Sequence, residues 1–254
     1  MAVSIDRVYQ KVLALANKEQ RGYITPQEFN LFADHAQKEI FEQYFYDLNQ
    51  FKRIPGNDTK YADMVDIIED KISIFLNFDR RFPITTPNGD VSLKEDMNGN
   101  TVSDVHRINV VKVYYYSHEQ LSIAEEMSRN EQTEQIMRSP LTKPSFKRPI
   151  FQKYNNYSDV SGVNRIKIYP IPLITDGCWI SYIKTPVKPN WSYVVINDKP
   201  LYNSTNAVDF ELHASEETEL VYRILALAGV AIEKPQLVQT AVGLGAGQIQ
   251  QEKQ

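Results

Sequence analysis

Four histidines, one cysteine and an asparagine-rich segment are the parts of this chain that could carry out chemistry. The histidines are His35, His106, His118 and His213. None of them has a second histidine, a cysteine or paired carboxylates at the spacing of metal ligands, which argues against a zinc site. We interpret them as polar or partly buried side chains. Cys178 lies in an apolar segment, which favours a small buried hydrophobe over a reactive thiol.

Two other segments resemble ligand-binding loops only in part. Residues 96–100, Asp-Met-Asn-Gly-Asn, start like a calcium loop, but Thr101 stands where glycine is needed and Arg107 where the twelfth-position glutamate is needed. Residues 243–247 alternate glycine but follow no predicted strand and lack the lysine and serine of a phosphate-binding loop. We therefore expect no metal, no cofactor and no enzymatic activity. A catalytic group assembled only by folding would appear as a polar cleft with shifted pKa values.

A basic stretch between residues 138 and 153 contains no acidic residue. Its basic side chains are Arg138, Lys143, Lys147, Arg148 and Lys153. Interleaved aromatics would allow this stretch to touch DNA or an acidic partner. A solvated loop or a protein contact is the favoured interpretation, because the formal net charge of the chain is −4 and nucleic-acid modules usually carry a basic domain.

The composition indicates a folded protein with large contact surfaces. At 254 residues the chain can bury a core without disulfides, as one large domain or two small ones. It has 15 tyrosines and 11 phenylalanines, which suit protein interfaces or packed strands. The N-terminus lacks the pattern of a signal peptide and no stretch is apolar enough to span a membrane, so we expect a soluble protein.

The elements that would position these residues begin with helices. Apolar spacing predicts a helix over residues 4–20, a long helix over 25–53 and a third over 61–76. Thr25, Pro26 and Glu28 form the pattern of a capping box with proline at the first helical position. The long helix carries a wide aromatic band that we expect to serve helix packing and lateral contacts between chains. Its candidate interface residues are Phe41, Tyr44 and Phe45.

Strand patterns dominate the middle of the chain. Two asparagine-glycine turns, at 88–89 and 98–99, predict a β meander. Residues 107–116 are dense in β-formers and predict a central strand. We expect a polar helical insertion near 117–138, followed by strands at 150–154, 164–170 and 177–186.

The C-terminal part predicts one helix and a tail. Ser215 stands where an N-cap belongs, and Glu216 and Glu217 place negative charge in the first helical turn. The glycine- and glutamine-rich end cannot sustain a packed core alone, so we expect a flexible tail. This tail is either a disordered terminus or, as we favour for a ring, an arm that becomes ordered on a neighbouring subunit. Its candidate interface residues are Leu237, Val238, Leu244, Gln248 and Ile249.

These elements predict an α+β fold with an N-terminal helical bundle, a meander- or sandwich-like β domain, a C-terminal helix and a flexible tail. The expected regions are a helical region at 1–80, a mainly β domain at 81–214, a C-terminal helix at 215–241 that packs on the helical region, and the arm at 242–254.

Several segments together resemble the head-to-tail adaptor, or ring, proteins of short-tailed bacteriophages, especially crAss-like and related marine phages. The segments are residues 136–145, Arg148-Pro-Ile-Phe151, the block from Val163 to Ala241 and, within it, Asp209–Gly229 and Lys234–Gln239. The resemblance implies a virion structural protein that is not an enzyme. Such a protein is made in the host bacterial cytoplasm and forms a ring, twelve-fold in this family type, between the portal and the tail.

The same resemblance implies the partners: copies of this chain, the portal protein and adjacent neck or tail proteins. DNA would pass through the channel without sequence-specific contacts, and no membrane is involved. Three alternatives remain open at this point. They are another neck or tail ring or a tail-completion protein, a non-viral binding module or regulator, and a nucleic-acid-binding protein.

Overall fold

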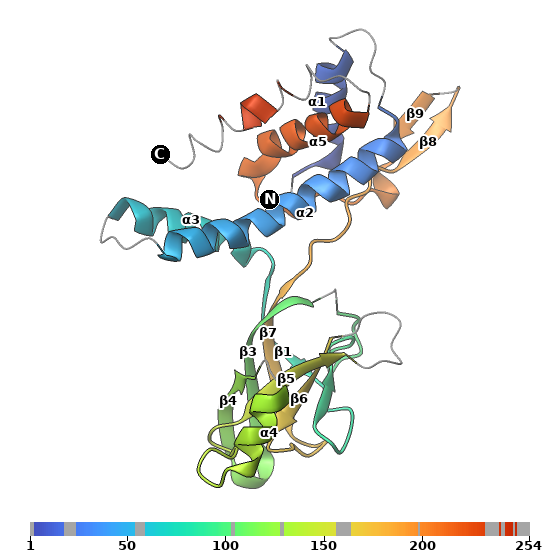
Figure 1. Cartoon of the computed structure of the whole chain (residues 1–254). Helices are drawn as coiled ribbons and strands as arrows, with labels where there is room; N and C mark the ends of the chain where they lie inside the picture. Colours follow the sequence, from blue (N-terminus) through green and yellow to red (C-terminus); the bar gives the residue numbers. More distant parts are fainter. Residues whose placement is uncertain are drawn as a thin grey trace. The chain divides into compact units, whose positions relative to one another are not determined.

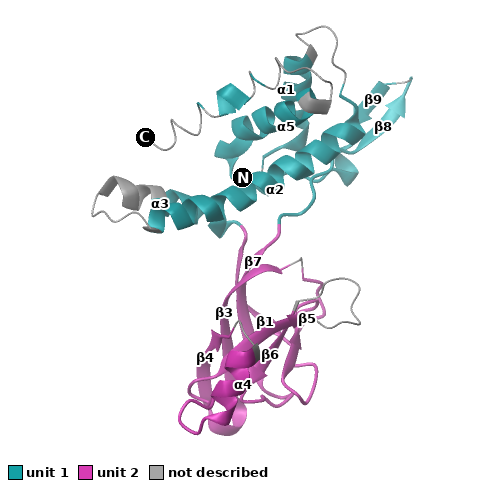
Figure 2. Cartoon of the chain, viewed as in Figure 1, with its two compact units in different colours: residues 1–74, 186–254 teal, residues 75–185 magenta. Residues whose placement is uncertain are grey.

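A computed structural model describes residues 3–17, 24–53, 59–102, 105–127, 130–155, 164–197 and 199–231, together with 239, 242–245 and 247. The fold is α+β, as the sequence predicts, and it divides into two compact units (Figure 2). Unit 1 contains residues 1–74 and 186–254, and unit 2 contains residues 75–185.

The unit boundaries differ from the expected ones at both ends of the β region. Residues 75–80 belong to unit 2, because the strand β1 (Leu76–Phe82) pairs with β7 (Gly177–Lys184). Residues 186–214 belong to unit 1, although the sequence pattern assigned them to the β domain.

The main elements among the described residues of unit 1 are helices α1 (Ile5–Asn17), α2 (Pro26–Arg53), α3 (Thr59–Ser73) and α5 (Glu217–Ala231) and a hairpin (Figure 1). Helix α5 packs against α1 and α2, and α3 packs against α2. Their core includes the fully buried side chains of Val8, Phe29 and Ile224. The hairpin consists of β8 (Tyr193–Ile196) and β9 (Lys199–Tyr202).

Local capping explains where two of these helices begin. At α2, the Thr25 N–H donates to Glu28 Oε2 at 2.9 Å, and the Glu28 N–H donates to Thr25 Oγ1 at 3.3 Å, which confirms the capping box. At α5, the prediction that Ser215 is the N-cap is wrong. One turn of 3₁₀ helix, residues 214–216, precedes α5, and the cap is His213, whose side chain accepts the Ser215 N–H.

Unit 2 is a seven-stranded sheet with the order β1-β7-β3-β4-β5-β6-β2. The other strands are β2 (Asp90–Ser92), β3 (Val105–Tyr115), β4 (Gln120–Glu126), β5 (Ile150–Asn155) and β6 (Asn164–Tyr169). Neighbouring strands are antiparallel, apart from the parallel pair β4 and β5. The strand that the sequence predicts as central, β3, lies inside the sheet between β7 and β4.

The expected helical insertion at 117–138 is only partly helical. Residues 120–126 form strand β4, and helix α4 covers only Asn130–Arg138. Within β4 the buried Ser122 and Ala124 alternate with the exposed Leu121 and Ile123, which is the two-residue period of a strand. The polar composition of β4 made the strand hard to predict, because a serine occupies one of its core-facing positions.

Both asparagine-glycine turns are present. Gly89 and Gly99 have φ of 79° and 76°, a conformation that side-chain-bearing residues rarely adopt. The second turn is held by Asp96, whose Oδ1 accepts the N–H groups of Asn98 at 2.9 Å and Asn100 at 2.8 Å. The segment that resembled a calcium loop is therefore an Asx-type turn. Within the parts of the chain that are described, no helix is long and apolar enough to cross a membrane.

Candidate functional site

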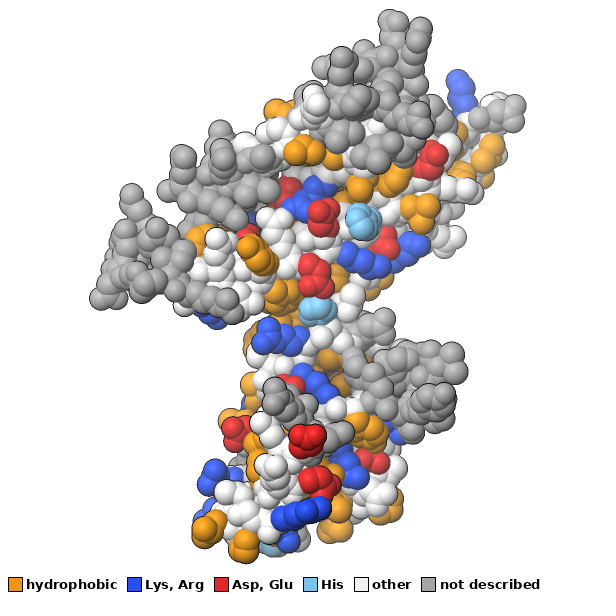
Figure 3. All heavy atoms as spheres, viewed as in Figure 1, with side chains coloured by type: hydrophobic (Ala, Val, Ile, Leu, Met, Phe, Trp, Pro, Cys, Tyr) orange, Lys and Arg blue, Asp and Glu red, His pale blue; other side chains and the backbone are white. Residues whose placement is uncertain are grey.

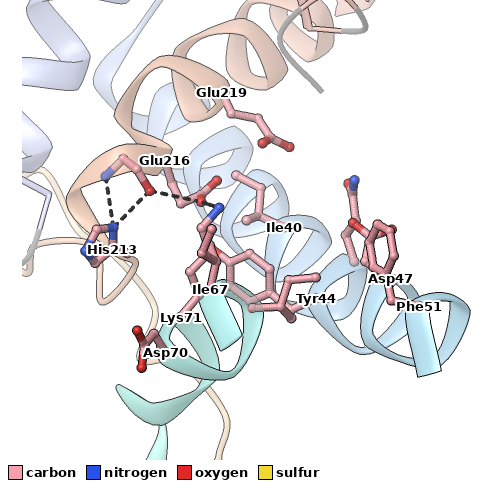
Figure 4. A pocket seen from close by; sticks show the side chains of 13 residues that line it. Ile40, Tyr44, Asp47, Phe51, Ile67, Asp70, Lys71, His213, Glu216 and Glu219 are labelled. Carbon is pink, nitrogen blue, oxygen red and sulfur yellow. Dashed lines mark hydrogen bonds and ion pairs between the residues drawn. The ribbon is translucent and has the colours of Figure 1, made fainter. Parts of the chain in front are cut away.

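Unit 1 contains a pocket of about 460 Å³ between α2, α3 and the start of α5 (Figure 4). Its apolar lining comes from Ile40, Tyr44, Phe51, Ile67 and Ile68. Its polar lining comes from Gln43, Asp47, Asp70, Lys71, His213, Ser215, Glu216 and Glu219. The apolar spacing of α2 and α3 turns these aliphatic and aromatic side chains toward one another, and the turn before α5 adds the polar edge.

An ion pair joins two sides of this pocket. Lys71 Nζ on α3 lies 2.6 Å from Glu216 Oε1, and the side chain of Glu216 is 1% exposed (Figure 4). The ammonium group of Lys71 also lies 5.9 Å from the centre of the Tyr44 ring. The pair fixes the position of α3 relative to the turn that starts α5.

The charged lining of the pocket is predominantly acidic. It includes four carboxylates, from Asp47, Asp70, Glu216 and Glu219, and a single lysine. Lys71 balances Glu216, and Arg223 binds Glu219 through charge-assisted hydrogen bonds. The exposed carboxylate of Asp70 adds negative charge at the rim, so the site suits an apolar group accompanied by cations.

His213 and Ser215 lie close together but have a structural role. His213 Nδ1 is 2.9 Å from Ser215 Oγ and also accepts the backbone N–H of Ser215 at 3.3 Å. His213 Nδ1, the ring nitrogen nearest the Ser215 hydroxyl, therefore caps the turn before α5. This geometry explains how the helix starts and assigns no nucleophile.

The β8–β9 hairpin is an apolar element on the outside of unit 1 (Figure 1). Its exposed apolar side chains are Val194, Val195, Ile196, Leu201 and Tyr202. Among the described residues no third strand pairs with it, and a two-stranded hairpin alone is marginally stable in water. Exposed apolar side chains are thus concentrated on this small element.

The base of the hairpin is firmly attached to the helices. Trp191 is buried, and its ring centre lies 4.2 Å from that of Tyr9. Its indole N–H donates to Asp6 at 2.9 Å, and its backbone N–H donates to Asn30 at 2.8 Å. The apolar tip is thus presented on a fixed base, which reduces the entropy lost on binding.

The basic stretch of unit 2 lies on its surface. Arg138, Lys143, Lys147 and Arg148 are exposed, whereas Lys153 forms an ion pair with Glu126 at 2.9 Å. Hydrophobic and basic side chains lie close together at the end of unit 2 where Figure 1 draws this loop (Figure 3). The aromatic Phe146 is only partly exposed, because it packs on the core of unit 2.

Two of the three aromatic candidates of the long helix face inward. Phe41 and Tyr44 are 2% and 6% exposed in the fold of a single chain, and Phe45 is half-buried with its ring edge against Phe41. Little of Phe41 and Tyr44 is left for a lateral contact, because their apolar surface is used between helices. Of the arm residues, Leu244 is 50% exposed, while Leu237, Val238, Gln248 and Ile249 lie outside the described residues.

In the described ranges, no three side chains among His, Cys, Asp and Glu are grouped as a metal site would require. Burial raises the pKa of the Cys178 thiol to about 12, which keeps the thiol protonated. No protein-family model matches this chain, and no curated protein matches it at a significant level.

Proposed function

We propose that this protein is a structural component of a bacteriophage virion, a head-to-tail adaptor that forms a ring between the portal and the tail. In this proposal the chain binds copies of itself, the portal protein and adjacent tail proteins, and DNA passes through the channel without sequence-specific contacts. It acts as a building block and not as an enzyme. The proposal follows from the resemblance to phage adaptor proteins and from the surfaces of unit 1.

The single observation that supports it best is the β8–β9 hairpin. Four aliphatic side chains, Val194, Val195, Ile196 and Leu201, are each about half exposed on one small element. Burying one such side chain on a partner contributes about 1.5–3 kcal/mol at most. A hairpin held at its base by Trp191 and covered by a partner at its tip is typical of a protein whose role is contact.

Ring assembly requires two unlike faces on each copy. A contact between different surfaces, repeated around an axis, closes into a ring when the rotation per copy divides the circle evenly. The hairpin is suited to a partner in the next layer, such as the portal protein. The lateral contact between copies must then come from other surfaces of the chain.

Binding to the portal protein of the same phage tests this function. We expect the full chain to co-elute with the portal protein in gel filtration, and Val195→Asp to weaken binding at least about tenfold because it places a charge in an apolar contact. Leu31→Asp is the matched control, since Leu31 is 62% exposed on α2. Failure of the wild-type chain to bind portal or tail proteins would refute the adaptor role.

A further inference from the structure

We propose that a loop of unit 2 in one copy docks into the pocket of unit 1 in the next copy. The loop comprises residues 138–148 and is called the basic loop below. Leu141 enters the apolar part of the pocket. The cations of the basic loop then face the carboxylates that line the pocket. The inference rests on the proposed function, because it assigns the lateral contact between copies of the ring.

The basic loop carries an apolar side chain that its own chain leaves uncovered. Leu141 is 94% exposed, although leucine is among the residues that are most often buried. The turn around it is held by hydrogen bonds, because the Lys143 N–H donates to the carbonyl oxygen of Ser139 at 3.0 Å. The leucine is therefore displayed on an ordered turn.

The far side of the loop is anchored as well. Ser145 and Arg148 exchange backbone hydrogen bonds of 3.3 and 2.9 Å around a tight turn. Between them, Phe146 packs on the core of unit 2 and lies 5.0 Å from the ring of Tyr115. Two turns thus hold the loop, so that little ordering is needed when it binds.

Among the described residues, the cations of the loop are free of ion pairs. Arg138, Lys143, Lys147 and Arg148 are exposed, and none of them forms an ion pair among the described residues. By contrast, Lys153 on the adjacent strand is paired with Glu126. Four exposed cations and one exposed leucine within eleven residues match the chemistry of an apolar pocket with an acidic rim.

The pocket of unit 1 has this complementary chemistry. Ile67, which is 50% exposed, and Ile40 supply apolar walls for a leucine, and about 460 Å³ is ample for its side chain. Asp70 supplies an exposed rim carboxylate in addition to those balanced by Lys71 and Arg223. Charge complementarity therefore favours the basic loop as the occupant.

The β8–β9 hairpin, which also exposes apolar side chains, fits the pocket less well. In the β8–β9 hairpin, Lys199 is the only cation among the residues of the two strands. The basic loop has four cations within eleven residues. A loop and a pocket are also two unlike surfaces, which is the kind of contact that can repeat around an axis.

Sedimentation velocity of the full chain, alone and mixed with the portal protein, tests the proposed contact between the basic loop and the pocket. Leu141→Asp and Asp70→Lys should each weaken association between copies about tenfold or more, because one removes the apolar insertion and the other reverses a rim charge. Both positions are exposed, so the variants should fold like the wild type. Ile174→Asp and Leu31→Lys are matched controls at exposed apolar positions and should assemble normally.

A mixture of the two variants tests whether the loop of one copy meets the pocket of another. Leu141→Asp keeps an intact pocket, and Asp70→Lys keeps an intact basic loop. An equimolar mixture should therefore form one-to-one dimers and nothing larger, while each variant alone stays monomeric. A mixture without dimers would overturn the inference, since the loop and pocket would not meet between copies.

The remaining outcomes have distinct meanings. If the wild type assembles and both variants assemble equally well, the inference is refuted while the ring function stands. If the wild type does not assemble alone or on the portal protein, the ring function itself is refuted. If Leu141→Asp and Lys143→Glu assemble normally but Lys143→Glu loses salt-sensitive binding to a DNA duplex, the basic loop is a DNA contact and the inference is wrong.

Discussion

Lys71 and Glu216 form an ion pair of 2.6 Å that connects α3 to the turn before α5, two elements far apart in the sequence. Glu216 is almost fully buried, so removal of Lys71 leaves a buried carboxylate without its cation. We predict that Lys71→Met lowers the free energy of unfolding by about 3 kcal/mol. Urea denaturation followed by circular dichroism measures this loss.

An exposed ion pair on α2 provides the control for the Lys71→Met variant. Lys38 and Asp34 pair at 2.8 Å on α2, but the side chain of Lys38 is 52% exposed. Lys38→Met should cost less than about 1 kcal/mol. If the two lysine variants unfold at the same urea concentration, the Lys71–Glu216 pair does not hold α3 in place.

The turn around Asp96 should make unit 2 sensitive to acid. Burial by itself raises the pKa of Asp96, but the hydrogen bonds from Asn100 and Arg80 outweigh it and lower the pKa to about 2. In the unfolded chain an aspartate has a pKa of about 3.9. The ionised carboxylate therefore stabilises the fold above about pH 4, and this contribution is lost as the pH falls from about 4 toward 2.

We accordingly predict that Asp96→Asn lowers the Tm at pH 7 and that the difference from the wild type narrows between about pH 4 and 2. Differential scanning calorimetry across this range provides the measurement. Asp66→Asn, at an exposed position of α3, is the control at pH 7 and should leave the Tm nearly unchanged. A gap between wild type and Asp96→Asn that stays constant down to pH 2 would contradict the account of Asp96.

Cys178 should be unreactive while the protein is folded. Its side chain is fully buried in β7, and burial raises its pKa to about 12, so the thiolate is almost absent at neutral pH. We predict that iodoacetamide labels it only after denaturation in urea, as mass spectrometry would reveal. Rapid labelling of the native protein at pH 8 would show that unit 2 opens at this strand.

Trp191 should control the attachment of the β8–β9 hairpin. Its ring contacts Tyr9, and its indole N–H donates to Asp6. We predict that Trp191→Ala lowers the free energy of unfolding by about 3–5 kcal/mol, because it removes a large buried side chain and leaves a cavity. Val195→Asp at the exposed tip should leave the unfolding midpoint unchanged. If both variants unfold alike, the hairpin is not anchored as described.

Much of the fold could be predicted from local patterns. The start of α2 follows from Thr25 and Glu28, which carry a complete capping signal in four residues. The position of β3 follows from its run of β-branched and aromatic residues. These signals need no knowledge of distant contacts, so local sequence was sufficient.

Elements that depend on distant partners were harder to predict. Strand β4 is polar, and its identity depends on pairing with β3 and not on its own composition. The β8–β9 hairpin was missed because prolines surround it, although Val194, Val195 and Ile196 form a β-branched run before an asparagine. That run was the signal that could have identified it.

The pocket was not predictable from spacing. Its lining comes from α2, α3 and residues 213–219, which only folding brings together. The aromatic band of α2 was recognised, but Phe41 and Tyr44 are largely covered by neighbouring helices. The sequence pattern could not distinguish an aromatic face that packs within a chain from one that packs between chains.

We propose that this protein works as a ring of identical copies between the portal and the tail of a phage. Electron cryomicroscopy of the native particle that contains this chain would locate the chain and count its copies around the tail axis. We expect a closed ring of twelve copies at the neck. Density for the chain elsewhere in the particle, or its absence from purified particles, would refute the proposed ring.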